Sequence, residues 1–383
     1  MVRIIGGLVT LGWSVAILKG LRAWNSKKWV LSKEAPSGPE DISVSIVIPA
    51  RNEEGSLDAC LESARNQDHP ALQILVLDDA STDRTPDIVS SHATVDGRVT
   101  ALTGDGQPLP DGWFGKPWAL ERAQQHATGE WLAFIDADVQ LAPEAISRAL
   151  AYVKAHDLDM LTGVGDLTVQ TFWERVLQPA VGGLILAGNS LSQVNDPKQK
   201  DKNLANGQFI FVSRAAYDAI GRHSCVRQNI LDDVGIARAL VAADKSYHCL
   251  YLHELFSCRM YTSLSEIWEG WTKNLFAGLR YSWANLAMAV FFTFIFSVMG
   301  QLLVLLGVLQ WVSHEAFVWG IAMTLSCQGL RLLMDIRRKQ PVLYGLSHSL
   351  ANVMLIGILI HSAIRTARGT VRWKGRTYRP TDG

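Results

Sequence analysis

Long apolar stretches lie at both ends of this 383-residue chain, and the middle is much less apolar. The first stretch runs from Ile4 to Leu21 and is followed by basic residues that include Arg22 and Lys28. Its length is close to the lower limit for crossing a bilayer, and basic residues favour the cytoplasmic side. A cleaved signal peptide is the competing interpretation, but no small-residue cleavage site follows. The sequence therefore predicts an uncleaved anchor over residues 1–28, with the next domain in the cytoplasm.

Three further apolar stretches occupy the C-terminal third of the chain, at Leu286–Trp311, Ala316–Met334 and Val342–Ile364. The basic loop 335–339 is expected in the cytoplasm, which fits two crossings before it. The tail after the third stretch is also basic, yet a third crossing would place it outside. Because the third stretch carries several polar residues, a re-entrant segment or a helix in the membrane interface is an alternative to a crossing. We expect a multi-pass protein of the cell (inner) membrane.

Composition limits the classes of function. The formal net charge is zero, so no global field attracts nucleic acid and no such partner is expected. Five scattered cysteines form no Cys-x-x-Cys pair, which indicates reduced thiols in a cytosolic domain rather than a disulfide framework. We divide the chain into an N-terminal anchor, a central cytoplasmic domain, C-terminal membrane helices and a basic tail, at residues 1–28, 41–285, 286–364 and 365–383.

The central domain alternates between apolar runs, acidic turns and helix-like segments. This alternation is typical of βαβ units, and it predicts an α/β fold with a mainly parallel sheet. The predicted strands are Ile42–Ile48, Leu72–Leu77, Val99–Leu102 and Trp131–Ile135. The predicted helices are Ser56–Arg65 and Thr85–His92.

Pairs of carboxylates follow two of the predicted strands, Asp78 with Asp79 and Asp136 with Asp138. The carboxyl ends of parallel strands face one crevice, where ligands of open α/β sheets bind. Paired buried carboxylates repel each other, and Mg²⁺ or Mn²⁺ shared with substrate phosphates would resolve that cost. The alternative is that each acidic turn caps the next helix. Two acidic turns in register are harder to explain by capping than one.

Neither a Gly-x-Gly-x-x-Gly sequence nor a Walker-type loop occurs in the chain. Nucleotide phosphates would therefore be held by a metal ion and by basic side chains. Lys116 is the candidate basic residue, although a solvated loop lysine is the ordinary alternative.

Five motifs occur in order and at suitable spacing, and together they resemble a family 2-type glycosyltransferase of the GT-A fold. They are Val47–Glu53, Leu77–Asp83, Gly115–Ala119, Ile135–Asp138 and Leu231–Ala237. More narrowly, the chain resembles membrane-anchored carotenoid glucosyltransferases and hopene-associated glycosyltransferases, a likeness to which the tail Trp373–Tyr378 also contributes. The resemblance covers residues 42–285 well and the membrane part loosely. It implies a Rossmann-like catalytic domain between N-terminal and C-terminal transmembrane helices.

The resemblance also implies roles for individual residues. Asp136 would contact the nucleotide and share the metal, Asp138 would ligate the metal directly, and Lys116 would add positive charge. Asp233 would be the general base of an inverting, in-line attack, beside Asp232 where the family usually has Glu. Acids also favour helix N-termini, so Asp232 and Asp233 have an ordinary alternative as the start of a helix. The implied base- and ribose-binding residues are Pro49, Arg51, Asn52, Glu53 and Asp79.

One family motif is incomplete. Many relatives carry Gln/Arg-x-x-Arg-Trp near the end of the catalytic domain; here Trp271 keeps the tryptophan's place, but Gly270 stands where the arginine would. Lys273 or Arg259 would be substitutes for the arginine, whereas Trp271 with Trp268 is also typical of an aromatic belt at a membrane.

The acceptor region is expected between Asp138 and Asp233. The apolar segment 172–189 is either a helix on the bilayer or a core helix. Residues Gly207–Val212 are predicted to form a strand beside the site, where Asn206 and Gln208 are expected to contact the sugar.

Together these features predict transfer of a hexose from a nucleotide sugar to a hydroxyl or carboxyl of a membrane lipid, such as a carotenoid or hopanoid. UDP-glucose is the donor that family habit suggests. The alternatives are an inactive membrane scaffold and a processive polysaccharide synthase, the latter disfavoured by the incomplete motif. A phosphotransferase with an Asp nucleophile is disfavoured because its acidic pair would follow the first strand.

Overall fold

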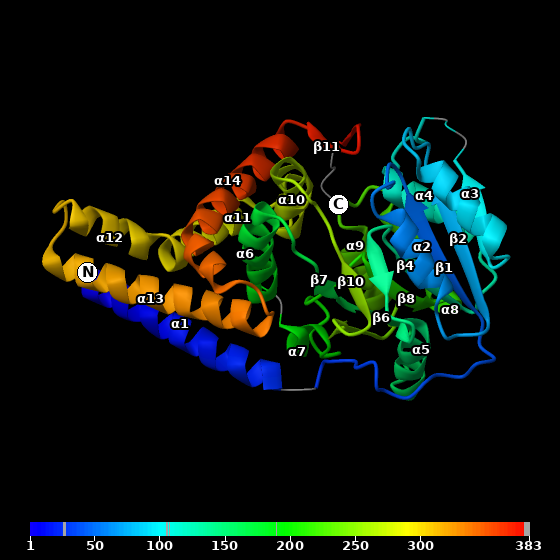
Figure 1. The fold of residues 1–383 in the computed structure, drawn as a ribbon, viewed down its shortest axis with the longest axis horizontal. Helices are drawn as coiled ribbons and strands as arrows, with labels where there is room; N and C mark the ends of the chain where they lie inside the picture. Colours follow the sequence, from blue (N-terminus) through cyan, green and yellow to red (C-terminus); the bar gives the residue numbers. More distant parts are fainter. Residues whose placement is uncertain (26–27, 105, 107, 189, 379–383) are drawn as a thin grey trace.

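The computed structural model describes residues 1–25, 28–104, 106, 108–188 and 190–378. An α/β domain forms one part of the molecule, and apolar helices extend away from it on the other side (Figure 1). Four predicted features fall partly outside the described residues: the end of the anchor at 26–27, residues 105 and 107 of the central domain, position 189 of the acceptor segment and the last residues of the tail.

The α/β domain is organised around a seven-stranded sheet with the order β3-β2-β1-β4-β8-β6-β9. Neighbours pair in parallel except at β8, which runs antiparallel to both β4 and β6. The mainly parallel α/β sheet of a GT-A fold is therefore confirmed. Its strands are β1 Val44–Ala50, β2 Leu72–Asp78, β3 Val99–Thr103, β4 Trp131–Ile135, β6 Met160–Val164, β8 Phe209–Ser213 and β9 Tyr247–Tyr251.

Both faces of this sheet are covered by helices, as continuous apolar strands require. Ile46 and Ile48 of β1 pack in one core with α2, α3 and α5, whereas Val47 packs in the other with α4, α8 and α9. The helices are α2 Leu57–Arg65, α3 Thr85–Val95, α4 Gly115–Gln124, α5 Ala145–Ala155, α7 Leu191–Val194, α8 Arg214–Ala219, the 3₁₀ helix Arg222–Val226 and α9 Asp232–Ala242.

Strand β1 continues two residues beyond its predicted end at Ile48 and includes Pro49. The N–H of Val44 donates to the carbonyl oxygen of Ala71, on the side of β2. Because the N–H groups of successive residues point to opposite sides of a strand, the nitrogen of residue 49 faces β4. The pairing with β4 has already stopped at Val47, and the missing N–H of Pro49 therefore costs no ladder hydrogen bond.

A second, three-stranded sheet stands at the carboxyl end of β4. Strand β5 (Val139–Leu141) starts directly after Asp138 and pairs with β10 (Phe256–Cys258), which also pairs with β7 (Asp166–Leu167). The Asp136–Asp138 segment is therefore held between two strands of different sheets.

The apolar helices form a bundle beside the α/β domain (Figure 1). Helix α1 packs along α13, and α12 packs on α13 from another side, where Gly300 and Gly320 allow close approach. Helix α14 packs against α6, α10 and α11. The bounds are α1 Val2–Asn25, α6 Phe172–Gly188, α10 Leu264–Gly278, α11 Trp283–Ser297, α12 Met299–Val308, α13 His314–Arg337, the 3₁₀ helix Val342–Ser347 and α14 His348–Ala367.

Three described helical stretches are long and apolar enough to cross a membrane: Val2–Lys19, His314–Arg337 and Val342–Ala367. A fourth span is possible if α10 and α11, which meet at a 119° bend, count as one. The stretch Leu286–Trp311, expected as a single helix, is divided at Val298 between α11 and α12. After α14 the chain forms the C-terminal hairpin, strands β11 (Val371–Trp373) and β12 (Arg376–Tyr378), which contacts α10 and residues of the α/β domain.

Candidate active site

All the predicted site residues line one cavity, with a volume of about 3260 Å³, at the carboxyl end of the sheet. Asp79 follows β2, Asp136 and Asp138 follow β4, and Asp232 and Asp233 begin α9. The sheet therefore brings together acids that are up to 154 positions apart in the chain. The acidic turns that follow β2 and β4 therefore contribute side chains to the same cavity.

The Asp-x-Asp segment carries the most strongly perturbed carboxylate of the cavity. Burial, reinforced by the nearby charges of Asp136 and Glu53, raises the pKa of Asp138 to about 7. Its Oδ1 atom is buried and has no hydrogen-bond partner among the described residues. Asp136 is paired, because its carboxylate lies 2.6 Å from the ammonium of Lys116.

Lys116 stands in the first turn of α4 and is half-buried in the cavity, so it is not a solvated loop lysine. Burial acts to lower the pKa of its ammonium, but Asp136, Asp232 and Asp233 outweigh burial and raise that pKa. Lys116 therefore stays protonated and links the two acidic pairs electrostatically.

A divalent ion such as Mg²⁺ or Mn²⁺ needs oxygen ligands from the protein, the substrate or water. No group of three or more His, Cys, Asp or Glu side chains in the described part of the chain is arranged to hold an ion. Mg²⁺ and Mn²⁺ sites that involve phosphates often use only one or two carboxylates, with phosphate oxygens and water completing the shell. The unpartnered oxygen of Asp138 beside Asp136 fits such a partial site.

Asp233 is held by backbone donors from two segments. Its carboxylate accepts hydrogen bonds from the N–H of Gly207, at 2.8 Å, and of Val234, also at 2.8 Å. Burial and the neighbouring Asp232 raise the pKa of Asp233 to about 6, while Lys116 acts in the opposite direction. Asp233 does lie in the first turn of a helix, where an acid is favoured. That position alone does not account for its hydrogen bond from Gly207, which belongs to another segment, or for its place in the cavity.

The loops after β1 and β2 are tied to each other at the far end of the cavity. Arg51 donates to the carbonyl oxygen of Asp79 at 2.5 Å, and Asn52 accepts from the N–H of Thr82 at 2.8 Å. Asn52 has a positive φ of 52°, which an asparagine tolerates better than most residues. Pro49 lines the same end.

Two acids at this end pair with cations that the sequence analysis had not assigned to the site. Lys374 forms an ion pair with Glu53, and Arg376 approaches Asp79 to 2.5 Å. Both cations belong to the C-terminal hairpin. The one sequence signal was the concentration of basic and aromatic residues after α14, which was interpreted only in terms of membrane topology and family likeness.

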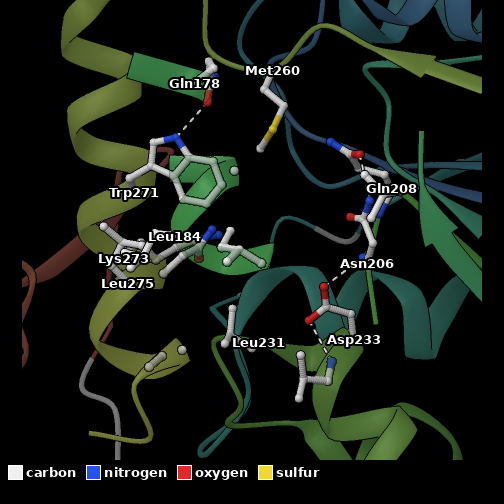
Figure 2. A pocket seen from close by; sticks show the side chains of 18 of the residues that line it. Gln178, Leu184, Asn206, Gln208, Leu231, Asp233, Met260, Trp271, Lys273 and Leu275 are labelled. Carbon is white, nitrogen blue, oxygen red and sulfur yellow. Dashed lines mark hydrogen bonds between the residues drawn. The ribbon is translucent and has the colours of Figure 1, made fainter. Parts of the chain in front are cut away.

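Trp271 lines the cavity, and its indole N–H donates to Gln178 of α6 at 2.9 Å (Figure 2). Trp268 instead donates to His361 of α14, so the two indoles have different protein partners. Gly270 leaves no room for a side chain beside the ring of Tyr261. The place of the family's arginine is therefore filled by an aromatic ring.

Asn206 and Gln208 stand next to the segment that holds Asp233 (Figure 2). The amide of Asn206 donates to Gln208 at 2.9 Å, and the Gln208 amide lies 3.1 Å from the sulfur of Cys258. Both side chains line the cavity.

The cavity extends from these polar residues into the helix bundle. Apolar side chains from several helices line this part: Leu184 of α6, Leu275 of α10, Phe292 and Phe296 of α11, and Leu355 and Leu359 of α14. Helix α6 also buries Val176, Leu177 and Val181 against α10 and α14, so it has the character of a core helix. One space thus joins a polar, acidic end to an apolar end.

Comparison with known proteins gives concordant results. The profile of glycosyl transferase family 2 matches residues 45–220. The chain is 25% identical over 346 residues to the 4,4'-diaponeurosporenoate glycosyltransferase of Staphylococcus aureus (strain MRSA252), covering 88% of each chain. It is 24% identical over 279 residues to that of Staphylococcus haemolyticus, covering 72% of each.

Among solved structures, a mannosyltransferase from Pyrobaculum calidifontis, determined in complex with GDP-Man and Mn²⁺, superposes with a TM-score of 0.52. Its sequence is 16% identical, and the match covers 95% of this chain and 98% of the other. This likeness concerns the fold. Residues 45–220 thus match the model of glycosyl transferase family 2, and most of the chain is distantly similar to the two 4,4'-diaponeurosporenoate glycosyltransferases.

Proposed function

We propose that this protein is an inverting glycosyltransferase that moves a hexose from a nucleotide sugar to a hydroxyl or carboxyl of a membrane lipid. The observation that carries the proposal is the single cavity that joins the acids of the α/β domain to apolar side chains of the helix bundle. A water-soluble donor suits the acidic end, and a lipid chain suits the apolar end. The relatives named above act on a carotenoid acid, which supports a long apolar acceptor.

In this mechanism Asp233 acts as the general base. It takes the proton of an acceptor hydroxyl while that oxygen forms a bond to the anomeric carbon. The bond from that carbon to the diphosphate oxygen breaks on the opposite side, so the configuration inverts and a nucleoside diphosphate leaves. A carboxylate acceptor would need no proton removal. The bonds from Gly207 and Val234 fix the direction of the Asp233 carboxylate.

The leaving diphosphate needs positive charge. Lys116 supplies one such charge from the start of α4. A Mg²⁺ or Mn²⁺ ion, when bound, would neutralise the growing charge on the diphosphate. Asp138 and Asp136 are the residues that would hold this ion. With basic residues flanking the apolar segments, the catalytic domain would face the cytoplasm, where nucleotide sugars are available.

The experiment that tests this function is release of nucleoside diphosphate by the purified, detergent-solubilised protein. Donors would include UDP-glucose and other UDP- and GDP-sugars, with Mg²⁺ or Mn²⁺, in the presence and absence of host lipid extract. Release that requires both lipid and metal is the expected result. Nucleotide binding without lipid-stimulated release would point away from a lipid acceptor, and absence of both would favour a scaffold.

The rate is expected to depend on pH through Asp233, whose pKa is raised to about 6. The base must be ionised, so the rate should fall below about pH 6 and stay level from pH 7 to 8. The charged or titratable groups that interact with Asp233 are Asp232, Lys116, Lys273 and Cys249.

An Asp232→Asn variant provides the matched test of this profile. Because the charge of Asp232 raises the pKa of Asp233, its removal should move the acidic limb to lower pH. A rate that is unchanged from pH 4.5 to 8, or a limb that does not move in the variant, would contradict the assignment.

A further inference from the structure

The C-terminal hairpin follows α14 and lies between the helix bundle and the α/β domain (Figure 1). Four of its residues line the cavity: Trp373, Lys374, Arg376 and Tyr378. Trp373 pairs with Arg376, and the two residues between them, Lys374 and Gly375, have positive φ values of 45° and 76°. Such a two-residue turn matches the twist of a tight antiparallel hairpin. Lys374 is thereby placed at the tip of the hairpin.

The two cations of the hairpin form ion pairs with acids to which the family resemblance assigns binding of the nucleotide base and ribose. The ammonium of Lys374 contacts the Glu53 carboxylate and donates to the carbonyl oxygen of Arg51 at 2.9 Å. The guanidinium of Arg376 donates to Asp79 at 2.5 Å. The side chains of Lys374 and Arg376 are 26% and 21% exposed, so water still reaches both pairs.

Aromatic contacts hold the hairpin in this position. Trp373 packs edge-on against Tyr261, with 5.5 Å between ring centroids, and the ammonium of Lys273 lies 4.8 Å from the centroid of the Trp373 ring. Tyr378 packs on Phe114 at 4.8 Å, directly before α4. The hairpin is therefore fixed beside the turn that carries Lys116.

The hairpin also reaches the place where the family motif is incomplete. The ring of Tyr261 fills the space beside Gly270, and Trp373 packs on that same ring. Gly270 brings no cation, Lys116 is paired with Asp136, and Arg259 is paired with Glu174, so the hairpin cations add positive charge at this end of the cavity.

We propose that Lys374 and Arg376 bind the diphosphate of the donor, a role that rests on the proposed function. On donor entry they would exchange Glu53 and Asp79 for phosphate oxygens and so make these two acids accessible to the base and ribose, with the guanidinium of Arg122 remaining 3.4 Å from the Asp79 carboxylate. The carboxylates of Glu53 and Asp79 are only 22% and 9% exposed, so these are not weak surface pairs. The exchange is favourable because a diphosphate offers each cation several charged oxygen atoms.

The test is equilibrium binding of UDP and UMP, and in parallel GDP and GMP, to the full-length detergent-solubilised protein at fixed Mg²⁺. The variants are Lys374→Ala, Arg376→Ala and the double substitution, and the matched control is Arg372→Ala, an exposed position in the same hairpin. We expect the double variant to bind the diphosphate about ten- to a hundredfold more weakly. Monophosphate binding should change much less, and the salt dependence of diphosphate binding should decrease.

The outcomes separate this inference from the proposed function. Equal loss of monophosphate and diphosphate affinity would indicate a merely structural hairpin, and tighter binding by the double variant would indicate a hairpin that only competes with the donor; each overturns the inference. Arg376→Gln, which keeps hydrogen-bond donors without the charge, repeats the test if the alanine variant does not fold. Failure of the unaltered protein to bind any of these nucleotides would overturn the inference and the proposed function together.

Discussion

An Asp233→Asn variant is expected to lose about 10²- to 10⁴-fold in turnover with a hydroxyl acceptor, because an amide cannot take the acceptor proton. The change keeps the size of the side chain, and the amide oxygen still accepts one of the two N–H bonds, which in Asp233 go to different carboxylate oxygens. Donor affinity should therefore change little, and the loss should be in kcat. Single-turnover transfer with saturating donor is the measurement that isolates this step.

The control for this variant is Asp244→Asn, the same chemical change near the C-terminal end of α9. Asp244 is exposed and pairs with Lys200 at 2.7 Å on the surface, so little effect on turnover or stability is expected. If Asp233→Asn retained full turnover with a hydroxyl acceptor, the base would have to be another residue.

An Asp138→Ala variant is expected to lose about 10²- to 10³-fold in activity, equivalent to the several kcal/mol that a metal ion supplies to a charged transition state. Two effects oppose each other in this variant. Removing a buried carboxylate with a raised pKa relieves repulsion from Asp136 and Glu53, so the donor-free protein should not unfold more easily. Metal affinity, however, should fall.

Titration of Mn²⁺ in the presence of UDP, followed by electron paramagnetic resonance of the free ion, measures that affinity without relying on activity. Asp218→Asn on α8, an exposed residue paired with Arg222, is the matched control. Unchanged Mn²⁺ binding by Asp138→Ala would show that other groups hold the metal, and metal-independent transfer by the unaltered protein would remove the ion from the mechanism.

Much of the α/β domain could be predicted because the central strands of its sheet are buried on both faces and are therefore largely apolar. The runs at Leu72–Leu77 and Trp131–Ile135 match β2 and β4 to within one residue. The acids that follow them share the cavity because parallel strands end at one edge, a consequence of topology that a local pattern reveals. A strand was also expected near Gly207–Val212, but its antiparallel direction in β8 is set by its partners.

The features that were not predicted depend on contacts between distant segments. The break at Val298 lies beside Ser297, Gly300 and Gln301, but these residues are too few to lower the average hydropathy of the apolar run, so hydropathy did not reveal it. The sequence also gives no sign that the ring of Tyr261 fills the space beside Gly270, although it does show that the arginine of the family motif is absent. The pairing of Lys374 and Arg376 with Glu53 and Asp79 needs the path of α14, which sequence analysis left open between a crossing and an interfacial helix.

The ion pair between Glu53 and Lys374 joins segments that are made early and late in synthesis. These residues are separated by 321 positions, with all the apolar helices after α1 encoded between them. The α/β domain can begin to fold while the ribosome is still making the helices, since domains generally fold as units in the order of synthesis. The hairpin would complete the wall of the pocket only after those helices have been made and have packed together. Completion of the proposed active site would therefore be coupled to assembly of the helix bundle, and a chain whose bundle fails to assemble would remain an incomplete catalyst.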